Sequence, residues 1–230
     1  RTSKPLTLYP SLFTPSSFPN IIDPMMKWLE AFVQQDWAFW FSRTCFLIYA
    51  RLFLDLRIEG QEKVPREGGL VVVSNHFSSL DPPVMGVAIP REANYMAKKE
   101  LFEKSPWFRL LILNLRAYPV DREGNATGAI KDSIRRVKDK QVAIGIFIQG
   151  TRNQGDAEAL DGAAFIAQRA GVPIQPAAIW KEGKKYRVRF GDPLVPEGKS
   201  REEASRLTGQ LMEDIKQLLP ENKRPAEMNA

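Results

Sequence analysis

Fully apolar runs along the chain alternate with segments in which apolar residues recur every three or four positions. Residues 70–73 and 142–148 are continuous apolar runs, a pattern typical of parallel strands that are buried on both faces. Between them, residues 126–138 carry isoleucine and valine on one helical face and basic residues on the other. This alternation predicts an α/β fold with a mixed, largely parallel sheet flanked by helices.

The same two patterns predict the remaining elements of this domain. Strands are expected at residues 94–97, 118–120, 174–180 and 186–190, and helices at 82–89, 107–115, 161–169 and from 201 onward. Gly171 suits the position after a helix, and Ser200 with Glu203 three residues later forms a capping-box pattern before the last helix. We expect residues 57–218 to form one domain and residues 219–230 a polar tail.

The first 56 residues have a different character. Residues 1–22 contain four prolines and are expected to form an irregular arm, and Asp23-Pro24 is a typical helix start. Residues 37–56 carry seven aromatic side chains but lack the ~18–20 consecutive apolar residues of a membrane span. Two interpretations stay open for this aromatic helical pair: a segment lying in a membrane interface, or a cover for the core of the main domain. We expect residues 1–56 to be an N-terminal arm with a membrane-interface helical segment.

Composition adds a mild basic charge and points to a reducing environment. The chain has 230 residues, with 33 Lys and Arg against 27 Asp and Glu, for a formal net charge of +6. Such a charge suits anionic partners, which include phosphate-bearing ligands, anionic membranes and nucleic acids. The single cysteine, Cys45, excludes a disulfide within the chain and fits a reducing compartment. The first residue is Arg and not Met, so a preceding targeting segment stays open.

The candidate chemistry centres on residues 74–82, Ser-Asn-His-Phe-Ser-Ser-Leu-Asp-Pro, which follow the first apolar run. His76 is the only histidine, and histidine is the side chain whose ordinary pKa lies closest to neutrality, so it is the first candidate for a general base. Asp81 lies five residues later, and a strand-to-helix turn would bring its carboxylate back to the imidazole. The alternative is an ordinary helix start, with Asp81 as the N-cap and Pro82 as the first helical residue.

Polar residues follow three of the expected strands. They are residues 74–81, the pair Asp121-Arg122 and the run Gln149-Gly150-Thr151-Arg152. Because the carboxyl ends of parallel strands meet at one edge of a sheet, these groups are expected to converge. Arginine binds phosphate through its planar fork, and glycine lets backbone N–H groups approach an anion. Each arginine taken singly fits a solvated loop charge or a local ion pair, but together they favour a phosphate-bearing substrate near a base.

Several other chemistries lack their sequence patterns. With one Cys and one His, the chain has no zinc site of the usual kind. It has no glycine-rich loop for nucleotide phosphates and no Gly-x-Ser-x-Gly elbow of a serine hydrolase. A basic cluster at residues 181–189 includes only one aromatic side chain, Tyr186, whereas nucleic-acid platforms need stacking aromatic residues among their charges. We therefore expect no zinc site of the usual kind, no nucleotide-phosphate loop and no nucleic-acid partner.

Residues 75–81, Asn-His-Phe-Ser-Ser-Leu-Asp, resemble the Asn-His-x-Ser-x-x-Asp motif of glycerolipid acyltransferases. The similarity continues in the same order through residues 97–101, 118–122, 147–152 and 172–176. Among these enzymes the chain most resembles the 1-acylglycerol-3-phosphate (lysophosphatidate) acyltransferase family, over residues 57–218. A His-x-x-x-x-Asp pattern alone is weak because it occurs by chance, whereas the ordered set of motifs is specific.

The resemblance implies transfer of a fatty acyl group from acyl-CoA or acyl-carrier protein to the free hydroxyl of lysophosphatidic acid, giving phosphatidic acid. It implies that His76 is the general base, that Asp81 orients it, and that no metal, cofactor or acyl-enzyme takes part. The expected substrate-binding residues are Asn75, Ser78, Arg122, Gln149, Gly150, Thr151 and Arg152, of which Arg122, Thr151 and Arg152 would hold the phosphate. The implied partners are a lysophospholipid, the acyl donor and a membrane surface. The expected location is the cytoplasmic face of a membrane, as a peripheral or monotopic protein.

The third motif departs from the family pattern Phe-Pro-Glu-Gly-Thr-Arg. Ile148 stands in place of the proline and Gln149 in place of the glutamate. Glutamine keeps the shape and the hydrogen-bonding capacity of glutamate but loses its charge. The loss of charge would weaken acceptor binding or change which acceptor is used. Two alternatives follow: an acyltransferase for another lysophospholipid or for glycerol-3-phosphate, and a lipid-binding protein with a degenerate site.

Overall fold

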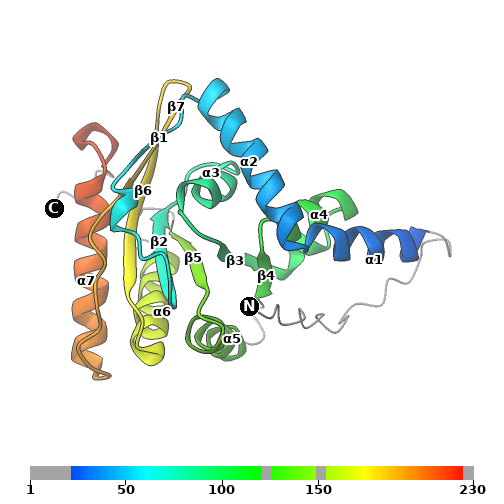
Figure 1. Ribbon diagram of the computed structural model, residues 1–230. Helices are drawn as coiled ribbons and strands as arrows, with labels where there is room; N and C mark the ends of the chain where they lie inside the picture. Colours follow the sequence, from blue (N-terminus) through cyan, green and yellow to red (C-terminus); the bar gives the residue numbers. More distant parts are fainter. Residues whose placement is uncertain (1–21, 121–125, 149–153, 225–230) are drawn as a thin grey trace.

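The computed structural model describes residues 22–120, 126–148 and 154–224, which are built around a seven-stranded sheet of order β1-β7-β6-β2-β5-β3-β4 (Figure 1). The strands are β1 (Arg57–Glu59), β2 (Leu70–Asn75), β3 (Ala93–Lys98), β4 (Ala117–Val120), β5 (Ala143–Ile148), β6 (Ile174–Glu182) and β7 (Lys185–Phe190). Strands β6, β2, β5, β3 and β4 are parallel, whereas β7 pairs antiparallel with β6 and parallel with β1. The expected α/β fold with a mixed, largely parallel sheet is confirmed.

Helices cover both faces of this sheet (Figure 1). They are α1 (Ile22–Val33), α2 (Asp36–Phe53), α3 (Asp81–Ala88), α4 (Pro106–Asn114), α5 (Ala126–Asp139), α6 (Gln154–Ala170) and α7 (Arg201–Leu218), with short 3-10 turns at Gln61–Lys63, Lys99–Phe102 and Glu221–Lys223. Side chains of α2 and α3 share one hydrophobic core with the sheet, and side chains of α5, α6 and α7 share another on the opposite face. The result is a three-layer sandwich with the sheet in the middle.

Strand β2 lies inside the sheet and is buried on both faces. Leu70 and Val72 join the core under α2 and α3, whereas Val71 and Val73 join the core under α6 and α7. All four side chains are at most 2% exposed. This two-sided burial is the physical reason for the continuous apolar run in the sequence, because neither face of the strand meets water.

The strand register places the carboxyl ends of β2 and β5 side by side at one edge of the sheet. Asn75 at the carboxyl end of β2 is paired with Ile148 at the carboxyl end of β5, and Ser74 is paired with Ala177 of β6 on the other side. Because these strands are parallel, the chain leaves β2 and β5 side by side and in the same direction. The turn of residues 76–80 therefore begins directly beside Ile148, where β5 ends.

The helix ends largely follow their sequence signals. Gly171 has a φ of 69°, as expected for the residue after α6 in a left-handed conformation. The Ser200 hydroxyl accepts a hydrogen bond from the Glu203 N–H at 3.2 Å, which confirms the N-cap of α7. In a complete capping box the Glu203 carboxylate would accept a hydrogen bond from the Ser200 N–H. Here it accepts from the Glu197 N–H at 2.9 Å instead.

Two elements differ from the sequence prediction. Helix α6 begins at Gln154 and not at residue 161, because the early Gly155 and Asp156 are weak helix formers that obscured its first turns. Strand β1 was not expected. It has only three residues and is defined by its pairing with β7, in which Ile58 lies opposite Val188.

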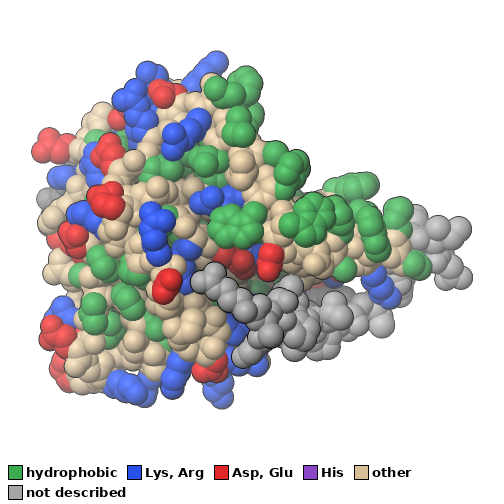
Figure 2. Space-filling view, viewed as in Figure 1, with side chains coloured by type: hydrophobic (Ala, Val, Ile, Leu, Met, Phe, Trp, Pro, Cys, Tyr) green, Lys and Arg blue, Asp and Glu red, His purple; other side chains and the backbone are tan. Residues whose placement is uncertain are grey.

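The N-terminal helical pair is present, and α2 has two different faces. On the inner face, Ala50 is fully buried in the core shared with α3. On the same helix, Arg43 donates hydrogen bonds to the carbonyls of Gly86, Val87 and Ile89 at 3.1, 3.0 and 2.7 Å. These bonds give partners to carbonyl groups at the carboxyl end of α3. Hydrophobic side chains gather along the outer side of α2 and α1 (Figure 2). Among the described residues, no helix has both the length and the apolar character to cross a bilayer.

Candidate active site

The turn between β2 and α3 brings His76 and Asp81 together. His76 Nδ1 lies 2.8 Å from Asp81 Oδ2. A regular helix would place residues five apart on different faces, so the sharp turn at residues 76–80 decides this contact. The His76 side chain is 36% exposed whereas Asp81 is fully buried, so the imidazole can meet a substrate while the carboxylate is shielded from water.

The Asp81 carboxylate is held by the turn that it closes. Its Oδ2 also accepts hydrogen bonds from the backbone N–H groups of Phe77 and Ser78, both at 2.7 Å. Leu80 is the N-cap of α3 and Asp81 is the first helical residue, where the helix dipole favours a negative charge. The interpretation of Asp81 as an ordinary N-cap is wrong, because its carboxylate binds the preceding turn and not the first N–H groups of α3.

Asp81 decides which nitrogen of His76 carries the proton. Because a carboxylate oxygen accepts hydrogen bonds, a neutral His76 keeps its proton on Nδ1. The lone pair of the other nitrogen, Nε2, is then available, and Nε2 has no hydrogen-bond partner within the described residues. This tautomer is the one that can accept a proton from a substrate hydroxyl.

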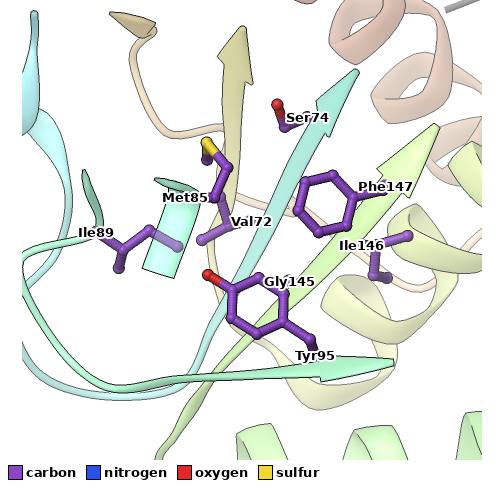
Figure 3. A pocket seen from close by; sticks show the side chains of 8 residues that line it. All are labelled: Val72, Ser74, Met85, Ile89, Tyr95, Gly145, Ile146 and Phe147. Carbon is purple, nitrogen blue, oxygen red and sulfur yellow. The ribbon is translucent and has the colours of Figure 1, made fainter. Parts of the chain in front are cut away.

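A narrow apolar slot (Figure 3) is lined in part by Phe147, whose ring contacts His76. The Phe147 ring packs against His76 with ring centroids 4.9 Å apart, and Tyr95 stacks on Phe147 at 5.8 Å. The slot is lined by Val72, Ser74, Met85, Ile89, Tyr95, Gly145, Ile146 and Phe147, and it is too narrow to admit a water molecule. Gly145 makes room for Tyr95, because a Cβ there would lie 2.4 Å from the tyrosine ring.

The Tyr95 hydroxyl in this slot is buried and has no hydrogen-bond partner among the described residues. Burial raises the pKa of Tyr95, and the nearby Arg43 guanidinium opposes this only in part. Tyr95 therefore stays protonated at neutral pH. The sequence offered no signal for Tyr95, because nothing in its local pattern separates a residue beside the site from any other strand residue.

Asn75 is tied to the neighbouring strand. Its side-chain amide donates to the Ile179 carbonyl at 2.8 Å, and its Oδ1 accepts from the Ile179 N–H at 2.8 Å. These two bonds fix the carboxyl end of β2 against β6, directly before His76. The substrate-binding role expected for Asn75 stays a prediction, and the amide supports the site by positioning the strand end.

Ser78 uses its polar groups within and beside the turn. Its N–H donates to Asp81 Oδ2, and its carbonyl accepts from the Asp81 N–H at 3.0 Å. Its hydroxyl accepts from the Leu80 N–H and from the Tyr186 hydroxyl, both at 3.3 Å. Tyr186 comes from β7 and lies 108 residues from Ser78 in the sequence. Sequence reasoning missed this contact because only the pairing of strands in the sheet brings the two residues together.

The other expected site residues, Arg122, Gln149, Gly150, Thr151 and Arg152, lie outside the described residues. The strands that precede them, β4 and β5, end at Val120 and Ile148 at the same edge of the sheet as β2. Their roles stay predictions. Across the three described ranges, no three His, Cys, Asp or Glu side chains form a group that could hold a metal ion.

Comparisons with known proteins bear on what this site does. A sequence model of the family described as Acyltransferase matches residues 55–180, more than half of the chain. This range contains all of β2 and the turn that carries His76 and Asp81. This family match identifies the chain as an enzyme of the O-acyltransferase class.

Individual relatives narrow the class. The 1-acyl-sn-glycerol-3-phosphate acyltransferase of Bacillus subtilis is 34% identical over 185 residues, which cover 73% of this chain and 89% of the relative. The enzyme of that name from Streptococcus pneumoniae is 34% identical over 146 residues, 58% of this chain and 53% of the relative. The crystal structure of the 1-acyl-sn-glycerophosphate (LPA) acyltransferase PlsC from Thermotoga maritima has a TM-score of 0.53 at 25% identity and covers 85% of this chain and 80% of that one. The chain belongs to the 1-acyl-sn-glycerol-3-phosphate acyltransferase family.

Proposed function

We propose that this protein transfers a fatty acyl group from acyl-CoA or acyl-carrier protein to the free hydroxyl of lysophosphatidic acid, giving phosphatidic acid. The observation that carries the proposal is the 2.8 Å contact between His76 Nδ1 and Asp81 Oδ2 at the carboxyl edge of the sheet. The membership of the chain in this family supports the reaction. The names of the relatives support the acceptor. Both donors carry the acyl group as a thioester, so the same chemistry serves either one.

In this mechanism His76 Nε2 accepts the proton of the acceptor hydroxyl as the oxygen attacks the thioester carbonyl. A C–O bond forms, the C–S bond breaks, and the imidazolium returns its proton to the leaving thiolate. Asp81 keeps the imidazole in the reactive tautomer and stabilises its positive charge in the transition state. The chain needs no acyl-enzyme for this route, because base and acceptor act directly on the thioester.

The acceptor phosphate is assigned to residues that follow β4 and β5 in the sequence. Arg122, Thr151 and Arg152 supply two guanidinium groups and a hydroxyl, a set that suits phosphate. The shared carboxyl edge of β2 and β5 supports this assignment, because Ile148, the residue before Gln149, is paired with Asn75, the residue before His76. Gln149 lies between these groups in the sequence, and it is the reason to test other acceptors.

The test of this function is an acceptor panel in which free-thiol release from acyl-CoA or acyl-carrier protein is measured. We expect release with lysophosphatidic acid to exceed that with a zwitterionic lysophospholipid by ~10–100-fold, because a charged hydrogen bond contributes ~1.5–3 kcal/mol. Equal or faster release with the zwitterionic acceptor would assign the enzyme to another lysophospholipid. Faster release with glycerol-3-phosphate would assign the enzyme to the acylation of glycerol-3-phosphate, the step that produces lysophosphatidic acid.

We propose that the protein acts at the cytoplasmic face of a membrane, held by the exposed apolar side of α1, α2 and α4. Large hydrophobic side chains on this side are Met25, Trp28, Phe32, Trp37, Trp40, Phe41, Ile48, Tyr49, Leu52, Phe53, Trp107 and Leu111, all at least 38% exposed. Some of these side chains contact one another, as in the ring contacts of Trp28 with Phe32 and of Phe32 with Trp37. So many exposed large apolar side chains on neighbouring helices suit a membrane interface. The sequence prediction gave the helix at residues 107–115 but limited the membrane-interface segment to residues 1–56, so Trp107 and Leu111 of α4 are additions from the structure.

The membrane prediction is tested with substitutions on the outer face of α2. Phe41→Ser, Ile48→Ser and Leu52→Ser remove three side chains that are 67%, 54% and 72% exposed. We expect the triple variant to lose ~100-fold or more in partitioning to anionic vesicles, because burying each such side chain contributes ~1.5 kcal/mol or more. Vesicle co-sedimentation measures the loss.

The matched control is Val195→Ser, which removes an apolar side chain that is 63% exposed but lies outside α1, α2 and α4. It should leave partitioning unchanged. Substitution is preferable to deletion of residues 1–56, because deletion would also remove the buried Ala50 and the Arg43 bonds to α3. Normal partitioning of the folded triple variant would contradict the interfacial role of α2.

A further inference from the structure

Tyr186 contacts the His76–Asp81 turn from outside it. This fully buried residue of β7 donates its hydroxyl to Ser78 Oγ at 3.3 Å. Its ring also stacks on the Phe77 ring, with centroids 6.0 Å apart and an interplanar angle of 22°. Two successive residues of the turn, Phe77 and Ser78, therefore contact the side chain of Tyr186, which belongs to β7.

These two residues are also the ones that hold the Asp81 carboxylate. The N–H groups of Phe77 and Ser78 both donate to Oδ2, the same oxygen that faces His76 Nδ1. The Ser78 carbonyl in turn accepts from the Asp81 N–H. A displacement of Ser78 would therefore change the position of the oxygen that orients the imidazole.

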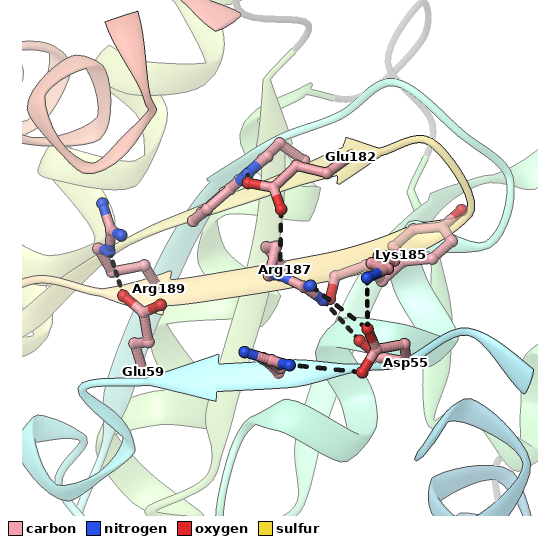
Figure 4. A network of polar contacts seen from close by, with 9 residues as sticks. Asp55, Glu59, Glu182, Lys185, Arg187 and Arg189 are labelled. Carbon is pink, nitrogen blue, oxygen red and sulfur yellow. Dashed lines mark hydrogen bonds and ion pairs between the residues drawn. The ribbon is translucent and has the colours of Figure 1, made fainter. Parts of the chain in front are cut away.

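Tyr186 is itself anchored on its other side. Its N–H donates to the Leu54 carbonyl at 2.9 Å, directly after α2. Its carbonyl accepts from Arg187 Nη1 at 2.8 Å, and Nη1 also donates to the Asp55 carbonyl at 2.6 Å. The Arg187 and Asp55 side chains form an ion pair at 3.4 Å. This pair is part of a wider network of charges that joins residues 55–59 to β6 and β7 (Figure 4).

We propose that Tyr186 is a positioning residue for the His76–Asp81 pair. Its hydroxyl and ring hold the turn of residues 76–80 against β7 and the end of α2, so that the Asp81 carboxylate stays in line with His76 Nδ1. This inference rests on the proposed function, because it assigns the pair its role in acyl transfer. Tyr186 does not touch the reacting atoms and acts only through the turn.

A comparison within the same core separates positioning from space filling. Tyr95 is also a buried tyrosine beside the site, yet its hydroxyl has no partner among the described residues. The Tyr186 hydroxyl instead reaches the one turn residue whose N–H, carbonyl and hydroxyl are all hydrogen-bonded. A phenylalanine would fill the Tyr186 site equally well, so the hydroxyl is the group to remove.

The experiment compares Tyr186→Phe, Ser78→Ala and the double variant in steady-state thiol release. We expect Tyr186→Phe to lower kcat about fivefold with KM for both substrates unchanged, because it loses one neutral hydrogen bond of ~1 kcal/mol that acts on orientation and not on binding. Because both single changes remove the same bond, the double variant should lose no more kcat than Ser78→Ala alone. An unchanged kcat in Tyr186→Phe, or losses that multiply in the double variant, would overturn the proposal.

Amide hydrogen exchange tests the same link without activity. The N–H groups of Phe77 and Ser78 should exchange faster in Tyr186→Phe, while those inside β2 keep their wild-type rates. Tyr118→Phe is the matched control, since it removes another buried tyrosine hydroxyl bound to a serine, Ser133, at 2.9 Å, and it should leave the two turn amides unchanged. Unaltered turn exchange in Tyr186→Phe overturns the positioning role. Absence of thiol release from the wild type would instead overturn the proposed function, so the two failures are distinguishable.

Discussion

Replacing His76 by alanine should lower acceptor-dependent thiol release by ~10²–10⁴-fold, the usual contribution of a general base. The loss should be close to complete because His76 is the only histidine in the chain, so no second imidazole can take over. The loss should lie in kcat, because the imidazole acts on the proton in the transition state and contributes little to holding the lipid. Thiol release at saturating acceptor and donor measures it.

The fold of His76→Ala should remain intact, since the side chain is partly exposed and makes one hydrogen bond to another side chain. Thermal unfolding and vesicle partitioning are therefore expected near their wild-type values, and they serve as the controls. An inactive variant with an intact fold places the base at position 76. Substantial turnover by the alanine variant would mean that another group, or water, accepts the proton.

Replacing Asp81 by asparagine should be nearly as damaging, with a kcat loss of ~10²–10⁴-fold. The amide Nδ2 of asparagine would donate to His76 Nδ1, which moves the imidazole proton to Nε2 and removes the lone pair that the acceptor needs. The carboxylate oxygen also accepts from the Phe77 and Ser78 N–H groups, so the neutral amide would loosen the turn as well. Steady-state kinetics with thermal unfolding measure both effects.

Asp192→Asn is the matched control for this change. Asp192 pairs with Lys63 at 3.0 Å and is 81% exposed, and a surface pair contributes only ~0–1 kcal/mol. It should leave kcat unchanged. Because His76 and Asp81 act as one unit, the double variant His76→Ala, Asp81→Asn should be no slower than His76→Ala alone. A folded Asp81→Asn with wild-type kcat would show that the contact does not set the tautomer.

Much of the fold followed from local patterns. The continuous apolar runs at β2 and β5 identified strands buried on both faces, and the 3.6-residue spacing identified α5 and α7. Short or weakly patterned elements were the ones missed. Strand β1 exists only because β7 pairs with it, and the first turns of α6 contain residues with low helix propensity.

The candidate site divides in the same way. The sequence by itself determined that a lone histidine and an aspartate five residues apart follow a buried strand, and its ordered motifs identified the family. Only the tertiary structure decided that the Asp81 carboxylate contacts His76 instead of the first N–H groups of α3. It also decided that Asn75 binds Ile179 and that Tyr186 contacts the turn. The physical reason is that local periodicity reports which face of an element is buried, whereas contacts such as Tyr186 to Ser78 depend on how the strands of the sheet are ordered.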